Sequence, residues 1–178
     1  MKIDVDVRQL GEVKHHALKD AVLALNEPVW HEDDLSKWQT DRVDVQSVVL
    51  VYCDGWQPIQ IARKSGWPHL NEQVIPLVTD IITQNYKPGG RLLRAMIAKL
   101  VVGGTIPLHW DKHPSFSVAH RIHVPLQTNP GVEFTVDEKR VIMEEGKAYE
   151  LNNLLPHGVY NGGKEDRIHL IFDYMAPQ

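Results

Sequence analysis

From residue 91 onward the chain is a succession of short extended runs separated by turn signals, and this pattern limits the folds open to it. The extended runs span residues 94–102, 120–126, 132–136, 147–152, 157–160 and 167–174. The turn signals between and around them are Gly103-Gly104, Asn129-Pro130-Gly131, Asn152-Asn153 and Asn161-Gly162-Gly163. Glycine and asparagine adopt the backbone conformations that tight turns need. Many short strands at spacings of roughly 8–12 residues are typical of a sandwich, jelly roll or barrel.

Before residue 91 the sequence indicates two helices and a buried strand. Residues 14–26 place apolar side chains at helical spacing, which predicts an amphipathic helix. Residues 47–53 are β-branched and apolar, as in a buried strand. Asn71 is a candidate cap for a second helix that residues 87–90 end. Pro76 then has to lie near the first turn, or the helix starts later than this cap suggests. The apolar stripe of this helix consists of Val74, Leu77, Val78, Ile81 and Ile82.

Both halves together predict one α+β domain that is mainly β. The chain has 178 residues, which corresponds to one domain at ~150 residues each. Its 43% hydrophobic and 24% charged residues are a globular balance. We expect a single domain over residues 1–178. In it, residues 1–90 form a part with helices and a strand that supports a β core of residues 91–175.

Charge and composition exclude several classes of partner. The net charge of −4 gives no electrostatic footprint for nucleic acid. No apolar run is long enough to span a bilayer, and the first ten residues place acids where an export signal needs apolar side chains. The single cysteine, Cys53, excludes an internal disulfide, fits a reducing compartment and is expected to be buried. We therefore expect a cytoplasmic protein with no nucleic-acid or membrane partner.

Histidine is concentrated in the β-rich half. Six of the ten histidines fall between residues 109 and 169, namely His109, His113, His120, His123, His157 and His169. Histidine is the usual neutral metal ligand and proton carrier, so this region is where we expect the chemistry.

A set of two histidines and a carboxylate is available for a metal ion. In an extended segment, His109 and Asp111 point to the same face because they are two residues apart. His157 follows several strands later. Two histidines and one carboxylate on one face of a metal are the ligand set of non-haem Fe(II) oxygenases, which need open positions. Zinc fits the same three ligands, so ligand type alone does not identify iron.

Arg167 follows His157 by ten residues, across the turn at residues 161–163. In a jelly roll, an arginine at this place can point into the interior, where it needs an anionic partner. One interpretation is a structural ion pair with Asp111 or Asp173. The other is a bound carboxylate held by both arms of the guanidinium.

Alternation along residues 121–126 separates a polar from an apolar face. Arg121 and His123 share one face, and Ile122, Val124 and Leu126 share the other. If the apolar face is in the core, Arg121 and His123 line the same cavity as the metal ligands. A solvated outer face is the competing interpretation.

The order of these motifs resembles that of the Fe(II)/2-oxoglutarate-dependent dioxygenases and, more closely, of the aspartyl/asparaginyl β-hydroxylase family. The segments that carry the resemblance are IPLHWDKH, HRIHVPL, MEEGKAYELNNLLPHGVYN and DRIHLIFDYM. They cover roughly residues 90–175, and the combination is specific although no single motif is.

The resemblance implies a double-stranded β-helix core of the jelly-roll, cupin-like type. By position, it implies that Fe(II) is held by His109, Asp111 and His157, the distal carboxylate of 2-oxoglutarate by Arg167, and the cosubstrate near the metal by Arg121 and His123. The implied reaction consumes 2-oxoglutarate and O2, releases succinate and CO2, and hydroxylates an unactivated C–H bond.

The resemblance also implies an amino-acid unit as substrate. This is an aspartyl or asparaginyl residue of a peptide or protein, or a free amino acid such as proline. Lys112, His113 and His120 follow the ligand pair directly, and their positive character favours a carboxylate-bearing substrate. They are therefore the expected substrate contacts, with solvated loop residues as the alternative.

Two other classes of function remain open from the sequence. One is a cupin-type metal enzyme, an isomerase or hydrolase that uses zinc or manganese without 2-oxoglutarate. Arg121 and Arg167 argue against it, because such enzymes have no general need for a dicarboxylate anchor. The other is a non-catalytic β-sandwich binding module, which the intact set of metal ligands disfavours.

Overall fold

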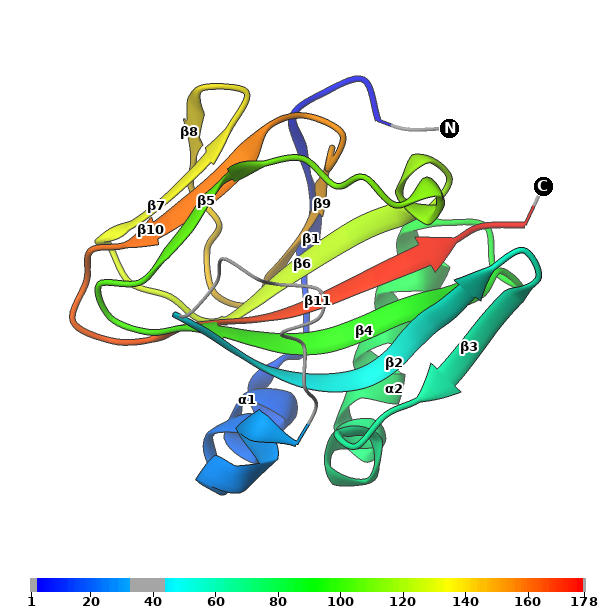
Figure 1. Ribbon diagram of the computed structural model, residues 1–178, viewed down its shortest axis with the longest axis horizontal. Coiled ribbons are helices and arrows are strands. Elements are labelled where there is room, and N and C mark those ends of the chain that lie inside the picture. Colours follow the sequence, from blue (N-terminus) through cyan, green and yellow to red (C-terminus); the bar gives the residue numbers. More distant parts are fainter. Residues whose placement is uncertain (1–2, 33–43, 178) are drawn as a thin grey trace.

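A computed structural model of the chain describes residues 3–32 and 44–177, which form two antiparallel sheets and a helical layer (Figure 1). The larger sheet contains, in spatial order, β1 (Val7–Glu12), β9 (Lys147–Leu151), β6 (His120–Gln127), β11 (Arg167–Met175), β4 (Arg91–Leu100), β2 (Val45–Trp56) and β3 (Ile59–Arg63). The smaller sheet contains β5 (Thr105–His109), β10 (His157–Asn161), β7 (Val132–Val136) and β8 (Lys139–Val141). The smaller sheet lies over one face of the larger, which confirms the predicted jelly-roll core.

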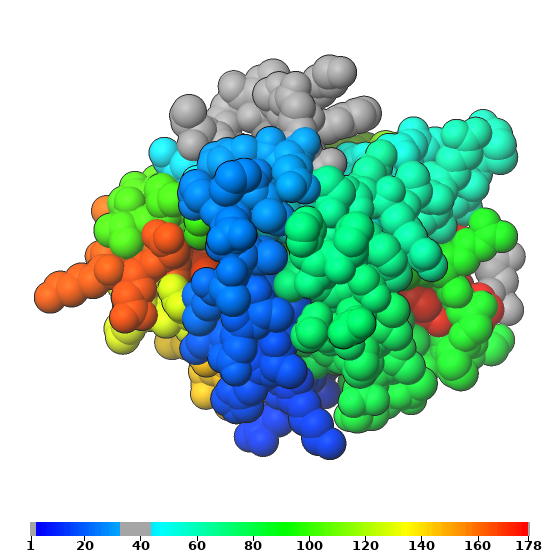
Figure 2. All heavy atoms as spheres, turned by 90° about the horizontal axis from the view of Figure 1, so that it is seen from below, coloured from blue at the N-terminus to red at the C-terminus, as the bar shows by residue number. Residues whose placement is uncertain are grey.

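The helical layer covers the outer face of the larger sheet. Its elements are α1 (His16–Leu23) and α2 (Trp67–Asn85), with a short 3-10 turn, η1 (Glu27–His31); a second 3-10 turn, η3 (Pro114–Ser117), follows β5. Figure 2 shows α1 in blue and α2 in blue-green side by side over this face. No helix in the described part of the chain combines the length and apolar character that crossing a membrane requires.

Strand alternation divides the larger sheet into an apolar outer face and a polar inner face. On β6, Ile122, Val124 and Leu126 are buried in the core under the helices. Arg121 and His123 face the other way, into the space between the sheets. The predicted apolar face of this strand is therefore in the core, and the competing interpretation of a solvated outer face is wrong for both polar residues.

The helix α2 begins earlier than the sequence indicated. It starts at Trp67 with Pro68 in its first turn, and the side chain of Asn71 donates a hydrogen bond back to the carbonyl of Trp67. Asn71 is therefore not a cap, and Pro76 lies inside the helix rather than near its start. The buried stripe that runs from Leu70 to Ile81 keeps the helix continuous, because packing against the sheet outweighs one missing hydrogen bond.

The first 90 residues contribute more strand than the sequence indicated. The expected strand at residues 47–53 is part of β2, and the buried Cys53 packs there against Leu93 and Ala119. The expected helix at residues 14–26 is shorter, because α1 ends at Leu23. The strands β1 and β3 form the two edges of the larger sheet, so this part belongs to the sheet as well as to the helical layer.

Candidate active site

A cavity of about 620 Å³ lies between the inner face of the larger sheet and the smaller sheet. The strands β2, β4, β6 and β11 supply one wall, and β5, β10 and the loop leading into η3 supply the other. A small apolar cluster that includes Phe134, Val136 and Leu151 fills part of the remaining space between the sheets. The cavity contains all of the predicted metal-ligand and cosubstrate residues.

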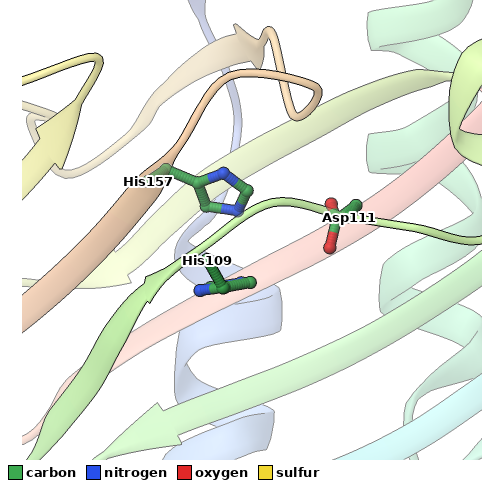
Figure 3. A group of neighbouring side chains, drawn as sticks. All are labelled: His109, Asp111 and His157. Carbon is green, nitrogen blue, oxygen red and sulfur yellow. The ribbon is translucent and has the colours of Figure 1, made fainter.

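The three predicted metal ligands meet at this cavity (Figure 3). His109 ends β5, His157 begins β10, and the two residues are directly paired across these strands. Asp111 follows on the loop, and ligand atoms of all three side chains lie within 4.8 Å of one another. The approach of β10 to β5 depends on Gly158, where a Cβ would lie 3.0 Å from the carbonyl oxygen of Ile106.

Backbone carbonyls orient both imidazole rings. Nδ1 of His109 lies 2.8 Å from the carbonyl oxygen of Pro107, and Nδ1 of His157 lies 2.9 Å from that of Leu155. A carbonyl only accepts, so each Nδ1 carries the proton and each Nε2 offers its lone pair. Burial lowers the pKa of His157 to about 4, so this ring is neutral at physiological pH, as a metal ligand must be.

The carboxylate of Asp111 is held by two donors on one oxygen. Its Oδ2 accepts hydrogen bonds from Nη1 of Arg121 at 2.6 Å and from Nδ2 of Asn153 at 3.0 Å. Burial opposes ionisation of Asp111, but the charge of Arg121 and the other polar neighbours outweigh it and hold its pKa below the usual range. The side chain is therefore anionic and available as a metal ligand. With the two histidines it forms a facial set that fits Fe(II) and leaves positions open.

Arg167 is buried at the far end of the cavity without an anionic partner among the described residues. It is 2% exposed, its Nη2 donates to Nδ1 of His169 at 2.9 Å, and its Nε has no hydrogen-bond partner. The ion pairs with Asp111 or Asp173 that the sequence left open are not formed, because both acids pair with Arg121 instead. Burial lowers the pKa of Arg167, because no neighbouring carboxylate offsets the loss of solvation.

His123 is the second orphaned polar group on this side of the cavity. Both of its ring nitrogens are buried without a partner. Burial and the charge of Arg167 lower the pKa of His123 well below its usual value, so the ring is neutral. Buried polar atoms in native proteins are normally satisfied, and groups left open at a cavity indicate a missing ligand. A dicarboxylate that reaches from the metal ligands to Arg167 would supply acceptors for the guanidinium and for the ring N–H of His123.

Arg121 lies at the opposite side of the ligand set and is already paired. Its Nε and Nη2 donate to the two carboxylate oxygens of Asp173 at 2.8 and 2.9 Å, and its Nη1 donates to Asp111. Three of its five N–H groups are thus used within the protein. The contact between Arg121 and the cosubstrate stays a prediction.

The three expected substrate residues are separated by the fold. Lys112 and His113 line the cavity, but His120 does not. His120 faces the helical side of β6, where its Nδ1 lies 2.6 Å from Oε1 of the buried Glu150. The substrate role predicted for His120 is therefore dropped, because it alternates with Arg121 and must point away from the cavity.

Of the remaining two, only Lys112 adds positive charge. Nδ1 of His113 lies 3.3 Å from Nη2 of Arg94, and burial together with the charge of Arg94 lowers the pKa of His113. The ammonium of Lys112 lies 5.0 Å from the centre of the Trp110 ring, at the cavity rim. The cationic character of this region thus comes from Lys112 and the two arginines Arg94 and Arg121.

Three further residues contribute to the site in roles that the sequence did not predict. Arg94 lines the cavity from β4, Asp173 lies behind Arg121 on β11, and Asn153 holds Asp111 from the β9–β10 turn. Asp173 was expected only as a partner of Arg167. Asn153 was interpreted only as a turn residue. Alternation from Arg167 predicts that Asp173 faces inward, but its partners depend on strand register.

Comparison with known proteins agrees with this fold. No curated protein sequence matches the chain. An oxidoreductase of the 2OG-Fe(II) oxygenase family from Burkholderia pseudomallei superposes with a TM-score of 0.63 at 14% identity, over 89% of this chain and 76% of that one. HygX from Streptomyces hygroscopicus, whose structure holds nickel, 2-oxoglutarate and hygromycin B, gives 0.58 at 13% identity over 96% and 83%. A prolyl hydroxylase from Trichoplax adhaerens, in complex with a peptide, gives 0.56 at 13% identity over 96% and 84%.

These likenesses show a shared fold. The family itself is shown by sequence, because the model of the aspartyl/asparaginyl beta-hydroxylase family matches residues 12–177. That match spans both the helical layer and the strands that carry the metal ligands. It confirms the resemblance drawn from the motifs and excludes the non-catalytic binding module: the chain belongs to the aspartyl/asparaginyl β-hydroxylase family of hydroxylases.

Proposed function

We propose that this hydroxylase depends on Fe(II) and 2-oxoglutarate, with His109, Asp111 and His157 as the iron ligands. The observation that carries the proposal is Arg167, a buried cation without a carboxylate partner in the cavity that the ligands share. An anionic cosubstrate would supply the missing counter-charge. When bound, the iron would couple oxidation of 2-oxoglutarate by O2 to hydroxylation of a C–H bond, with succinate and CO2 as the other products.

In this proposal the protein's own residues bind and orient the reactants. Arg167 holds the distal carboxylate of 2-oxoglutarate by charge-assisted hydrogen bonds. His123 offers a neutral ring nitrogen to the cosubstrate beside the metal. Phe134 packs against Arg167, with the guanidinium carbon 5.6 Å from the ring centre, and limits how the guanidinium can move.

For the substrate we propose an amino-acid unit, either a free amino acid such as proline or an aspartyl or asparaginyl residue of a peptide. The end of the cavity away from Arg167 supports this, because it has more cations than anions. Arg94, Arg121 and Lys112 face only Asp111 and Asp173. A carboxylate close to the oxidised carbon is the complementary group. Tyr52 and Phe116 provide apolar walls for the rest of the unit.

Binding measurements without O2 test the cosubstrate assignment. The wild-type protein loaded with Fe(II) should bind 2-oxoglutarate at one site in calorimetry, and Arg167→Met should lose this binding while it keeps the metal. Arg63→Met is the matched control, because Arg63 stacks on Trp67 and does not line the cavity. Metal binding without 2-oxoglutarate binding in the wild type would instead support the cupin-type enzyme.

A succinate assay tests the substrate assignment. Amino acids and peptides that contain aspartate or asparagine are incubated with iron, ascorbate, O2 and 2-oxoglutarate. Mass spectrometry should find one added oxygen on at least one of them. If only nucleobases, lipids or unrelated small molecules stimulate succinate release, the substrate class is wrong and the oxygenase assignment survives.

A further inference from the structure

A row of three charged side chains crosses the inner face of the larger sheet beside the metal ligands. Asp173 on β11 is paired in register with Arg94 on β4 and with Arg121 on β6. Directly opposite residues on neighbouring strands have Cβ atoms about 4.5–5.5 Å apart. The register of the central strands, rather than a loop, therefore fixes the place of the Asp173 carboxylate between two guanidinium groups.

The contacts within this row are short and buried. Nε and Nη2 of Arg121 donate hydrogen bonds to the two carboxylate oxygens of Asp173 at 2.8 and 2.9 Å. Nη1 of Arg94 lies 3.5 Å from Oδ2 of the same carboxylate. Asp173 is fully buried, and Arg94 is 4% exposed. The ring of Phe116 lies against both guanidinium groups, 4.6 Å from Arg94 and 4.3 Å from Arg121. Arg121 is thus held from two sides and has one arm left to reach Asp111.

Among the three metal ligands, Asp111 is the one that needs such support. His109 and His157 lie on paired strands and are oriented by backbone carbonyls. Asp111 lies beyond the end of β5, and its carboxylate can rotate unless a side chain holds it. The bonds from Arg121 and Asn153 both fall on Oδ2, which leaves Oδ1 for the metal.

We infer that Asp173 is a positioning residue for the metal centre, which it serves by fixing Arg121 and thereby the rotation of Asp111. This inference rests on the proposed function and adds a residue remote from the metal to its machinery. Groups that orient metal ligands typically change metal affinity or activity by roughly 10–100-fold when they are removed.

A Co(II) titration without O2 or 2-oxoglutarate tests the inference. Co(II) is a redox-stable probe whose visible spectrum reports its coordination. Asp173→Asn keeps the shape of the side chain but removes the charge, and we expect the Kd for Co(II) to rise by roughly 10–100-fold. The matched control is Asp54→Asn, since Asp54 pairs with Lys64 near the protein surface and should leave the Kd unchanged.

The same substitution in an Asp111→Ala background separates positioning from a general structural role. If Asp173 acts through Asp111, Asp173→Asn should add no further loss once Asp111 is gone. Equal losses in both backgrounds, or no loss in the presence of Asp111, would overturn the inference. Arg121→Lys is the second variant if Asp173→Asn does not fold, because a lysine cannot bridge two carboxylates. It should show the same dependence on Asp111.

The wild-type titration distinguishes failure of this inference from failure of the proposed function. If the wild type does not bind Co(II), or binds it equally well after His157→Ala, the proposed metal centre falls and the inference falls with it. If the wild type binds and only the effect of Asp173 is missing, the positioning role alone is wrong.

Discussion

The two ends of the active-site cavity both bury arginine, but they differ in what compensates the charge. At one end, Arg94 and Arg121 share the carboxylate of Asp173, and Arg121 also pairs with Asp111. At the other end, Arg167 is bonded only to the ring of His169, and burial together with Arg167 keeps the pKa of that ring well below its usual value. The first end is complete within the protein, whereas the second lacks a counter-charge.

This difference separates a structural arginine from one that binds a ligand. A buried charge costs several kcal/mol unless it is paired. A paired arginine therefore contributes geometry, and its removal damages the fold. An unpaired one lowers the stability of the free protein, and a bound anion would supply the missing partner. Substitutions at the paired end should therefore mainly lower stability, and substitutions at the Arg167 end should mainly weaken ligand binding.

The largest expected effect is on stability, at the compensated end. Asp173→Asn leaves two buried guanidinium groups without their shared carboxylate, and we expect the free energy of unfolding to fall by about 3–5 kcal/mol. Chemical denaturation of the metal-free protein measures this. If the variant is as stable as the wild type, the Asp173 carboxylate does not compensate the two arginines, and the two ends do not differ in charge compensation.

The next effect is on ligand binding, at the uncompensated end. Arg167→Met removes a charge that the free protein does not pair, so the free energy of unfolding should stay within about 1 kcal/mol of the wild type or rise. The affinity for 2-oxoglutarate should fall by about 2–5 kcal/mol, because one partner of a buried charge pair is lost on binding. On the same preparation, chemical denaturation measures the free energy of unfolding and calorimetry measures the affinity for 2-oxoglutarate.

How much of the fold could be predicted depended on where each strand lies in its sheet. The inner strands β2, β4, β6, β7, β9, β10 and β11 were all predicted from their apolar runs. The strands β1, β3, β5 and β8 were not among the predicted runs, and each is an edge strand with half-exposed or exposed residues. An edge strand has little apolar surface to bury, so its sequence lacks the pattern that identifies an inner strand.

The site could be predicted as far as side-chain alternation reaches. Alternation correctly placed Arg121 and His123 in one cavity with His157, and it could have placed His120 on the other face. It could not say that Asp173 pairs with Arg121 and leaves Arg167 free. That choice depends on which residues lie opposite each other on neighbouring strands, which the register decides and a single sequence does not reveal.

A further cluster of paired charges, around Glu150, lies outside the cavity. A substitution there should have a stability effect of intermediate size. The buried Glu150 accepts bonds from Arg8 at 2.6 Å, His120 at 2.6 Å and Tyr86 at 3.0 Å on the helical side of the sheet. Glu150→Gln should cost about 1–3 kcal/mol of stability at pH 7, because the negative charge is lost and one of the two accepting oxygens becomes an NH2 donor. It should leave the affinities for metal and 2-oxoglutarate unchanged, and a change in either would show that this cluster is coupled to the site.

The stability cost of Glu150→Gln should become smaller as the pH falls. Burial opposes ionisation of Glu150, but the hydrogen bond and charge of His120 together with Arg8 outweigh it and lower its pKa below the ordinary value. The lowered pKa means that its stabilisation is present above the pKa of the unfolded chain. It is lost as pH falls through the lower folded value. Wild type and Glu150→Gln should therefore converge in stability on the acid side.

The smallest expected effect concerns the neutral partner of Arg167. His169 is buried beside it, and its Nδ1 accepts a bond from Nη2 at 2.9 Å, which fixes the plane of the guanidinium without neutralising it. His169→Phe keeps an aromatic ring and removes the acceptor, so 2-oxoglutarate affinity should fall several-fold, by about 1 kcal/mol. His169→Asp should weaken binding more, because a carboxylate there would compete for Arg167 as Asp173 does for Arg121. Calorimetry on the metal-loaded variants decides this. If His169→Asp binds 2-oxoglutarate as well as the wild type, the missing counter-charge is not what makes Arg167 a ligand-binding residue.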